Sequence, residues 1–144
     1  MMLPNIVSRR TAGTDLLRLV LCAILFTHGA YRFYDGTVPV LGDILHEEGL
    51  PYGAVLAYLV DLAEVGGTLL LALRLLVVPV CGILCMIYST GIVLFHWHAG
   101  FFVVGPGNNG WEYSALLITC LLVTAWENRS RGFLPFGAAS GSLD

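Results

Sequence analysis

Lysine is absent from this sequence, and charged residues of every kind are few for a chain of 144 residues. Asp, Glu and Arg make up 12% of the chain, whereas 57% of the residues are hydrophobic and the mean hydropathy is +0.80. A soluble domain carries roughly twice that charged fraction. The net charge of −3 and the pI near 5.7 provide no basic stripe, so we expect no binding to nucleic acid. The composition indicates an integral membrane protein that contacts the lipid bilayer.

The connecting loops contain no cysteine, because all four cysteines fall inside apolar segments: Cys22, Cys81, Cys85 and Cys120. A quinone-coupled thiol oxidase needs reactive thiols at the periplasmic surface, so this class is disfavoured. We interpret the four side chains as small apolar packing residues. The chain also lacks a Rossmann loop or another redox motif. Any redox chemistry would therefore need a partner protein that carries the electron carrier or the substrate site.

Four apolar segments are expected to cross the bilayer, at residues 16–34, 52–73, 75–95 and 111–126. They predict an all-α integral membrane protein, a four-helix bundle that forms one domain over residues 16–126. Residues 1–15 would precede the bundle as an N-terminal segment. Residues 127–144, which are rich in Gly and Ser, are expected to form a flexible tail. The connections at 35–51 and 97–110 are interpreted as loops.

The positions of the arginines predict the orientation of the bundle. Those outside the apolar segments or at their ends belong to one side of the membrane: Arg9, Arg10, Arg18, Arg74, Arg129 and Arg131. By the positive-inside rule, both termini are then cytoplasmic. The Arg9–Arg10 pair resembles a twin-arginine signal, but the following run contains charged residues and no cleavage site of small residues, which favours a retained first helix. We expect a multi-pass protein of the bacterial cytoplasmic (inner) membrane.

Two carboxylates, Asp61 and Glu64, lie near the middle of the second apolar segment. An acid at that depth costs about 3 kcal/mol or more, so it is rarely present without a partner or a function. Other ionisable groups lie towards the outer side of the membrane, if a helix rises by about 1.5 Å per residue. They are His28 and Arg32 in the first segment, His96 at the end of the third and Glu112 at the start of the fourth.

Helical spacing predicts that these groups share the interior of the bundle. The expected stripes join His28 to Arg32, Asp61 and Glu64 to Thr68, and Ser89 to His96. Arg32 is long enough to pair with Asp61 or Glu64, and Asp61 is the preferred partner. Two interpretations remain open, a purely structural network and a polar pocket or proton pathway in the outer half of the bundle.

Histidine pairs also raise the question of haem and metal binding. A haem b between His28 and either His96 or His98 is disfavoured, because the first two would differ in depth by about 9 Å. His96 and His98 with Glu112 are an alternative metal site at the outer surface. Alternation on a helix points the two histidines apart, so no metal site is the preferred interpretation.

The order of several short motifs resembles the DoxX family of small four-helix membrane proteins, over residues 16–126. The motifs are HGAYRF (28–33), EVGGTLLLAL (64–73), residues 96–102, and Gly110-Trp111-Glu112. Arg32 stands where the family often has Lys; arginine keeps the charge but cannot release its proton. The resemblance implies a membrane subunit linked to oxidoreductase chemistry, with a quinone pool as electron acceptor. It also favours Glu64 over Asp61 as the functional acid.

Our main hypothesis is a quinone-interacting subunit of a membrane oxidoreductase system, and whether the chain is itself an enzyme stays open. Glu64 and His28 would exchange protons with a bound quinone. The expected ligand-binding residues are Tyr31, Arg32, Asp61, His96 and Glu112. A redox or other membrane protein partner is expected, and a homo-oligomer is compatible with the sequence. The alternatives are a non-enzymatic small-molecule binder or transporter, and a membrane assembly or scaffold protein.

Overall fold

The computed structural model of the chain describes residues 6–105 and 108–129. These residues form helices joined by turns and loops: α1 (Ile6–Tyr34), α2 (Val38–Glu47), α3 (Gly53–Ala72), α4 (Val77–Gly91) and α5 (Glu112–Asn128). A π-helix η1 (Ile92–His96) and a short 3-10 helix η2 (Trp97–Ala99) continue α4. Of the tail predicted at 127–144, residues 127 and 128 belong instead to α5, whereas 130–144 lie outside the described part of the chain, as do the first five residues.

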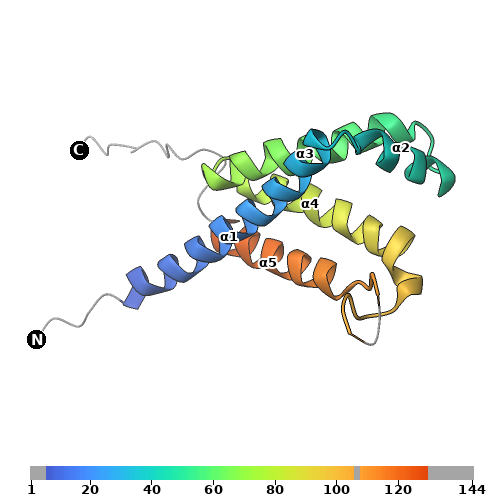
Figure 1. Cartoon of the computed structure of the whole chain (residues 1–144). Coiled ribbons are helices and arrows are strands. Elements are labelled where there is room, and N and C mark those ends of the chain that lie inside the picture. Colours follow the sequence, from blue (N-terminus) through green and yellow to red (C-terminus); the bar gives the residue numbers. More distant parts are fainter. Residues whose placement is uncertain (1–5, 106–107, 130–144) are drawn as a thin grey trace, which may run out of the picture.

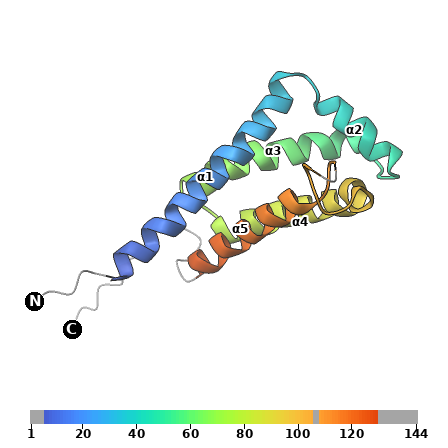
Figure 2. The same ribbon diagram turned by 60° about the horizontal axis from the view of Figure 1, so that its bottom comes forward.

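The four longest helices pack in two pairs. α1 packs along α3, and α4 packs along α5, as Figures 1 and 2 show from two directions. Contacts of α3 with α4 and of α1 with α5 join the two pairs. We call the end at residues 73–76, where α3 turns into α4, the turn end of the bundle. The opposite end, which α2 covers, is the α2 end.

Three helices are long and apolar enough to span a membrane. They are Ala12–Tyr34, Gly53–Ala72 and Val77–Ala99, each of at least 20 residues. The fourth predicted span corresponds to α5, which is shorter at 17 residues and less apolar. The chain is thus an all-helical membrane protein with several spanning helices. α1 begins at Ile6 rather than near Leu16, since no proline interrupts the intervening residues.

Residues 35–51 were predicted as a loop, and the structure corrects this prediction because they contain α2. The helix has an apolar stripe at Val38, Leu41, Gly42 and Leu45, the spacing by which a short helix buries one face. The stripe packs on the start of α3, where Gly42 lies directly against Gly53. A Cβ atom on Gly53 would lie 2.1 Å from the carbonyl oxygen of Gly42, so only glycine permits this crossing.

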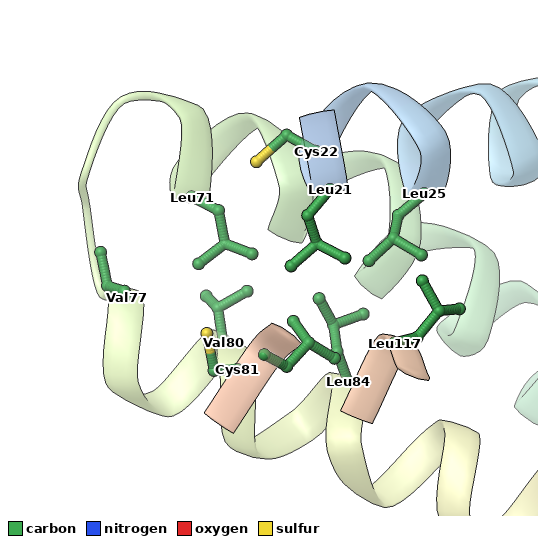
Figure 3. Packing of buried hydrophobic residues seen from close by; sticks show 10 residues of the cluster. Leu21, Cys22, Leu25, Leu71, Val77, Val80, Cys81, Leu84 and Leu117 are labelled. Atoms are coloured by element: carbon green, nitrogen blue, oxygen red, sulfur yellow. The ribbon is translucent and has the colours of Figure 1, made fainter. Parts of the chain in front are cut away.

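The larger hydrophobic cluster occupies the turn end of the bundle, and a smaller one of Val38, Leu45 and Ala57 lies at the α2 end. Figure 3 shows Leu21, Cys22 and Leu25 of α1 facing side chains of α3, α4 and α5. The cysteines belong to this core or pack against it, as predicted, and all four are free thiols. The same end also contains a buried cation that the sequence did not predict. Arg18 is 4% exposed and donates to the carbonyl oxygens of Leu71 (2.5 Å) and Ala72 (2.8 Å), which caps the C-terminus of α3.

Candidate functional site

The ion-pair cluster lies between α1 and α3, in the half of the bundle nearer to α2. Arg32 donates from Nε to Oδ1 of Asp61 at 2.8 Å and from Nη2 to Oε2 of Glu64. Both carboxylates are buried, at 4% exposure for Asp61 and 2% for Glu64. The expected pairing of Arg32 with Asp61 is therefore present, and Glu64 shares the same guanidinium. The two buried acids thus share one cation, which lowers the cost of burying them in an apolar bundle.

Gly29 explains how α1 comes close enough for these contacts. It faces α3, and a Cβ atom at this position would lie 3.0 Å from the Cβ of Glu64 and 3.0 Å from a methyl group of Val65. The missing side chain lets the two helices approach, as small residues do at helix contacts in membranes. Arg32 follows one turn later and is thereby held over the carboxylates.

Tyr88 completes the cluster from α4, and the sequence reasoning missed it. Its hydroxyl donates to Oε1 of Glu64 at 2.9 Å. Both carboxylate oxygens of Glu64 are therefore engaged, one by Arg32 and the other by Tyr88. A tyrosine in mid-segment, far from the aromatic belts expected at the two membrane surfaces, was the available signal.

A cavity of about 400 Å³ borders this cluster. It is lined by parts of α1, α2, α3, α4 and η1, and most of its wall is apolar. The polar groups in the wall are His28, Arg32, Glu64, Tyr88, Thr90 and His96. The volume lies within the usual range for small-molecule sites, which combine apolar walls with a few convergent polar groups.

The π-helix η1 forms part of the cavity wall through Leu94, Phe95 and His96. A π-helical turn shifts the helical phase, and such turns are frequent at functional sites. The predicted Ser89–His96 stripe is wrong for this reason: Ser89 is exposed, whereas His96 lines the cavity. Nδ1 of His96 lies 2.8 Å from the carbonyl oxygen of Asn109, so Nδ1 carries a proton in this contact, and in the neutral ring Nε2 is the acceptor nitrogen.

Two predicted ligand-binding residues lie away from the cavity wall. Tyr31 is 64% exposed on the surface of α1. Glu112 begins α5, and its Oε1 accepts a hydrogen bond from the backbone N–H of Val103 at 2.9 Å, which holds the loop before α5. Of the predicted residues, the structure brings Arg32, Asp61 and Glu64 into contact, and His28 and His96 line the adjoining cavity.

His98 is exposed in η2 and does not line the cavity. Within residues 6–105 and 108–129, no group of three or more His, Cys, Asp or Glu side chains is arranged to hold a metal ion. His28 and His96 instead belong to the wall of the same cavity, to which they contribute from different helices.

Comparison with known protein families identifies a match to part of the chain. The DoxX family model matches residues 13–97, from α1 to η2. No curated protein and no solved structure matches the chain. The matched region contains the whole ion-pair cluster and every residue in the cavity wall, and it ends before α5.

Proposed function

The chain belongs to the DoxX family, and from this premise we propose that it is the quinone-binding membrane subunit of an oxidoreductase system. The observation that carries the proposal is the buried carboxylate of Glu64, which is held by Arg32 and Tyr88 beside an apolar cavity. A quinone has the matching form: an apolar ring and tail, and polar oxygens that accept hydrogen bonds.

The charges around the cavity favour a neutral ligand over an anion. Arg32 is already shared by Asp61 and Glu64. An anionic substrate would meet two carboxylates for one guanidinium, which opposes binding. A neutral head group avoids this repulsion: a quinone oxygen could accept a hydrogen bond from His28, and a quinol hydroxyl could donate to Nε2 of His96 or to the hydroxyl oxygen of Tyr88. The substrate that supplies electrons then belongs to the partner protein.

Glu64 and His28 are the groups we assign to proton exchange. Reduction of a quinone to a quinol takes up electrons and protons in equal number, and the electrons come from the partner. Glu64 and His28 both line the cavity, and Glu64 also accepts a hydrogen bond from the hydroxyl of Tyr88. Arg32 keeps its proton and serves to hold Glu64 and Asp61 in place.

The same proposal includes the orientation in the membrane. Arg18 and Arg74 lie at the turn end, where Arg74 pairs with Asp15 at 2.5 Å, and α2 carries acidic residues at the other end. The positive-inside rule then puts the turn end and both termini on the cytoplasmic side of a bacterial inner membrane, with α5 as a fourth span. The cavity would lie in the outer half.

Glu64→Gln tests the proposal, because it keeps the shape of the side chain and removes its charge. We expect the variant in lipid nanodiscs to bind a tritium-labelled isoprenoid quinone about tenfold more weakly, because a neutral amide holds Arg32 and Tyr88 less firmly at the cavity wall than the carboxylate does. Glu127→Gln is the matched control, since Glu127 is exposed near the end of α5. Equal quinone binding by the two variants would contradict the proposal.

A non-enzymatic binder or transporter is the second candidate, favoured by the same cavity, because binding of a neutral amphiphile there needs no electron donor. Co-purification with a redox protein separates the two. A quinone-binding subunit must remain associated with a partner that reduces the bound quinone when its own substrate is added.

A further inference from the structure

The cavity reaches the surface of the protein at the level of the spanning helices. Three of its wall residues are exposed: His28 on α1, and Met86 and Thr90 on α4. All three lie within candidate membrane spans, Ala12–Tyr34 and Val77–Ala99, and Met86 is in the central part of its span. A surface at that level of a membrane protein faces hydrocarbon rather than water.

The α2 end of the cavity is closed by comparison. Leu41 and Leu45 of α2 and Leu50, which follows it, cover this end, and all three are buried or half-buried. Phe95 and His96 of η1 are half-buried beside them. His96 is hydrogen-bonded to the backbone carbonyl of Asn109, which belongs to the loop before α5. The tight Gly42–Gly53 crossing fixes α2 against α3, so this cover is part of the packed fold.

His28 is an unusual residue for a surface that faces hydrocarbon. It is exposed, and its ring makes no hydrogen bond to any other described residue. An ionisable side chain at membrane depth is costly unless it pairs with another group or takes part in function. At the rim of a cavity, its natural partner is the polar head of a molecule that arrives from the bilayer.

We propose that the ligand reaches this cavity sideways from the bilayer core, past a rim formed by His28, Met86 and Thr90, with α2 closing the aqueous end. The ligand class is a neutral lipid with a polar ring head and a long apolar tail. The head lies inside against Tyr88 and Glu64, and the tail extends past the rim into the lipid. This inference rests on the proposed quinone-binding function and adds the route to it.

The test measures how fast a bound ligand enters and leaves the cavity when a larger side chain narrows the rim. Met86→Trp adds bulk at the rim, and Ile83→Trp adds the same bulk on an exposed position of α4 that does not line the cavity. Both variants and the unmodified chain are placed in lipid nanodiscs with a tritium-labelled quinone that carries an isoprenoid tail. Association and dissociation are then followed by rapid filtration.

We expect Met86→Trp to slow association and dissociation together, each by roughly tenfold, while Ile83→Trp exchanges like the unmodified chain. Unchanged rates in Met86→Trp, with normal binding by the unmodified chain, would overturn the sideways route and leave the quinone site standing. Equal slowing in both variants would overturn it too. No binding by the unmodified chain would overturn the proposed function itself. Met86→Phe, a smaller change, repeats the measurement if the Trp variant fails to fold.

Discussion

At the scale of single residues, Arg32 is the group on which the buried acids depend. Arg32 lies on α1 and contacts two acids of α3, Asp61 through Nε and Glu64 through Nη2. The side chain of Arg32 is 17% exposed. Replacement of a buried ion pair by apolar groups is often tolerated, but removal of one partner leaves charge without compensation. The cluster therefore contributes little net stability as a whole and is sensitive to the loss of its cation.

Arg32→Met should destabilise the protein by about 3–5 kcal/mol, because two buried carboxylates lose their common cation. The measurement is reversible unfolding in mixed detergent micelles, followed by circular dichroism. Arg129→Met is the control, since Arg129 is exposed and its guanidinium only stacks 3.5 Å over the ring of Trp126. A loss in Arg32→Met no greater than in the control would show that the acids do not need the arginine.

Tyr88→Phe should destabilise the protein by about 1–3 kcal/mol, because Oε1 of the buried Glu64 loses its donor. Tyr58→Phe provides the comparison, since Tyr58 is 52% exposed on α3. Thermal unfolding of the two variants in the same detergent measures the difference. If both variants unfold at the same temperature as the unmodified chain, the Tyr88 hydroxyl does not support Glu64.

These residues show how far the site follows from the sequence. The pairing of Arg32 with the α3 acids was predictable, because the cost of isolated charge and the length of the arginine side chain leave few other partners. Tyr88 was not predictable, since its hydroxyl direction depends on the rotation of α4 about its axis. Glu112 was predicted at the site from its depth alone, but it bonds to the backbone N–H of Val103 instead.

At the scale of elements, α2 is the part of the fold that turns a helical bundle into one with a covered cavity. Its Leu41 and Leu45 form the wall at this end, and its position depends on the contact of Gly42 with Gly53. A search for spanning segments does not detect α2, because this helix has only 10 residues. Its apolar stripe, however, is present in the sequence. The π-helical turn in η1 is different, because no residue type specifies it.

Gly53→Ala should displace α2 and destabilise the protein by about 1–3 kcal/mol, the usual cost of overpacking. The new methyl group would lie 2.1 Å from the carbonyl oxygen of Gly42, which is backbone and cannot turn aside. Gly82→Ala is the matched control, because a Cβ atom there meets nothing within 4 Å. It should be neutral or stabilising, since alanine is the better helix former.

Limited proteolysis provides a second measurement for Gly53→Ala. A displaced α2 exposes the backbone of the connections on either side of it, so cleavage near Leu50 should become faster than in the unmodified chain. If Gly53→Ala and Gly82→Ala have equal stability and equal cleavage rates, the two helices do not rely on the glycine contact.

At the scale of the whole molecule, the two ends of the bundle differ in charge and in packing. The turn end contains the larger apolar cluster, the buried Arg18 and the Arg74–Asp15 pair. The α2 end contains the acidic surface of α2, with Asp43, Glu47 and Glu48 exposed. The helical class and the three long spanning helices were predictable from apolar segment lengths, whereas α2 was predicted as a loop. A pocket was one of the interpretations of the sequence, but its walls were not predictable, because they include Leu41 and Leu45 of α2.

This asymmetry predicts the orientation in the membrane. Because arginines near the span ends are retained on the cytoplasmic side, the turn end should face the cytoplasm and α2 the periplasm. Alkaline phosphatase is active only in the periplasm. A fusion that joins it after Gly49, beyond α2, should therefore be active in bacterial cells, whereas a fusion after Asp144 should be inactive. Green fluorescent protein at the same two positions should give the opposite pattern, since it becomes fluorescent in the cytoplasm but not after export in an unfolded state.

Activity of phosphatase at Asp144 with fluorescence at Gly49 would reverse the orientation and put the cavity in the cytoplasmic half. Phosphatase activity at both positions would mean that α5 does not cross the membrane, in which case the bundle has the three spans that length and hydropathy alone support.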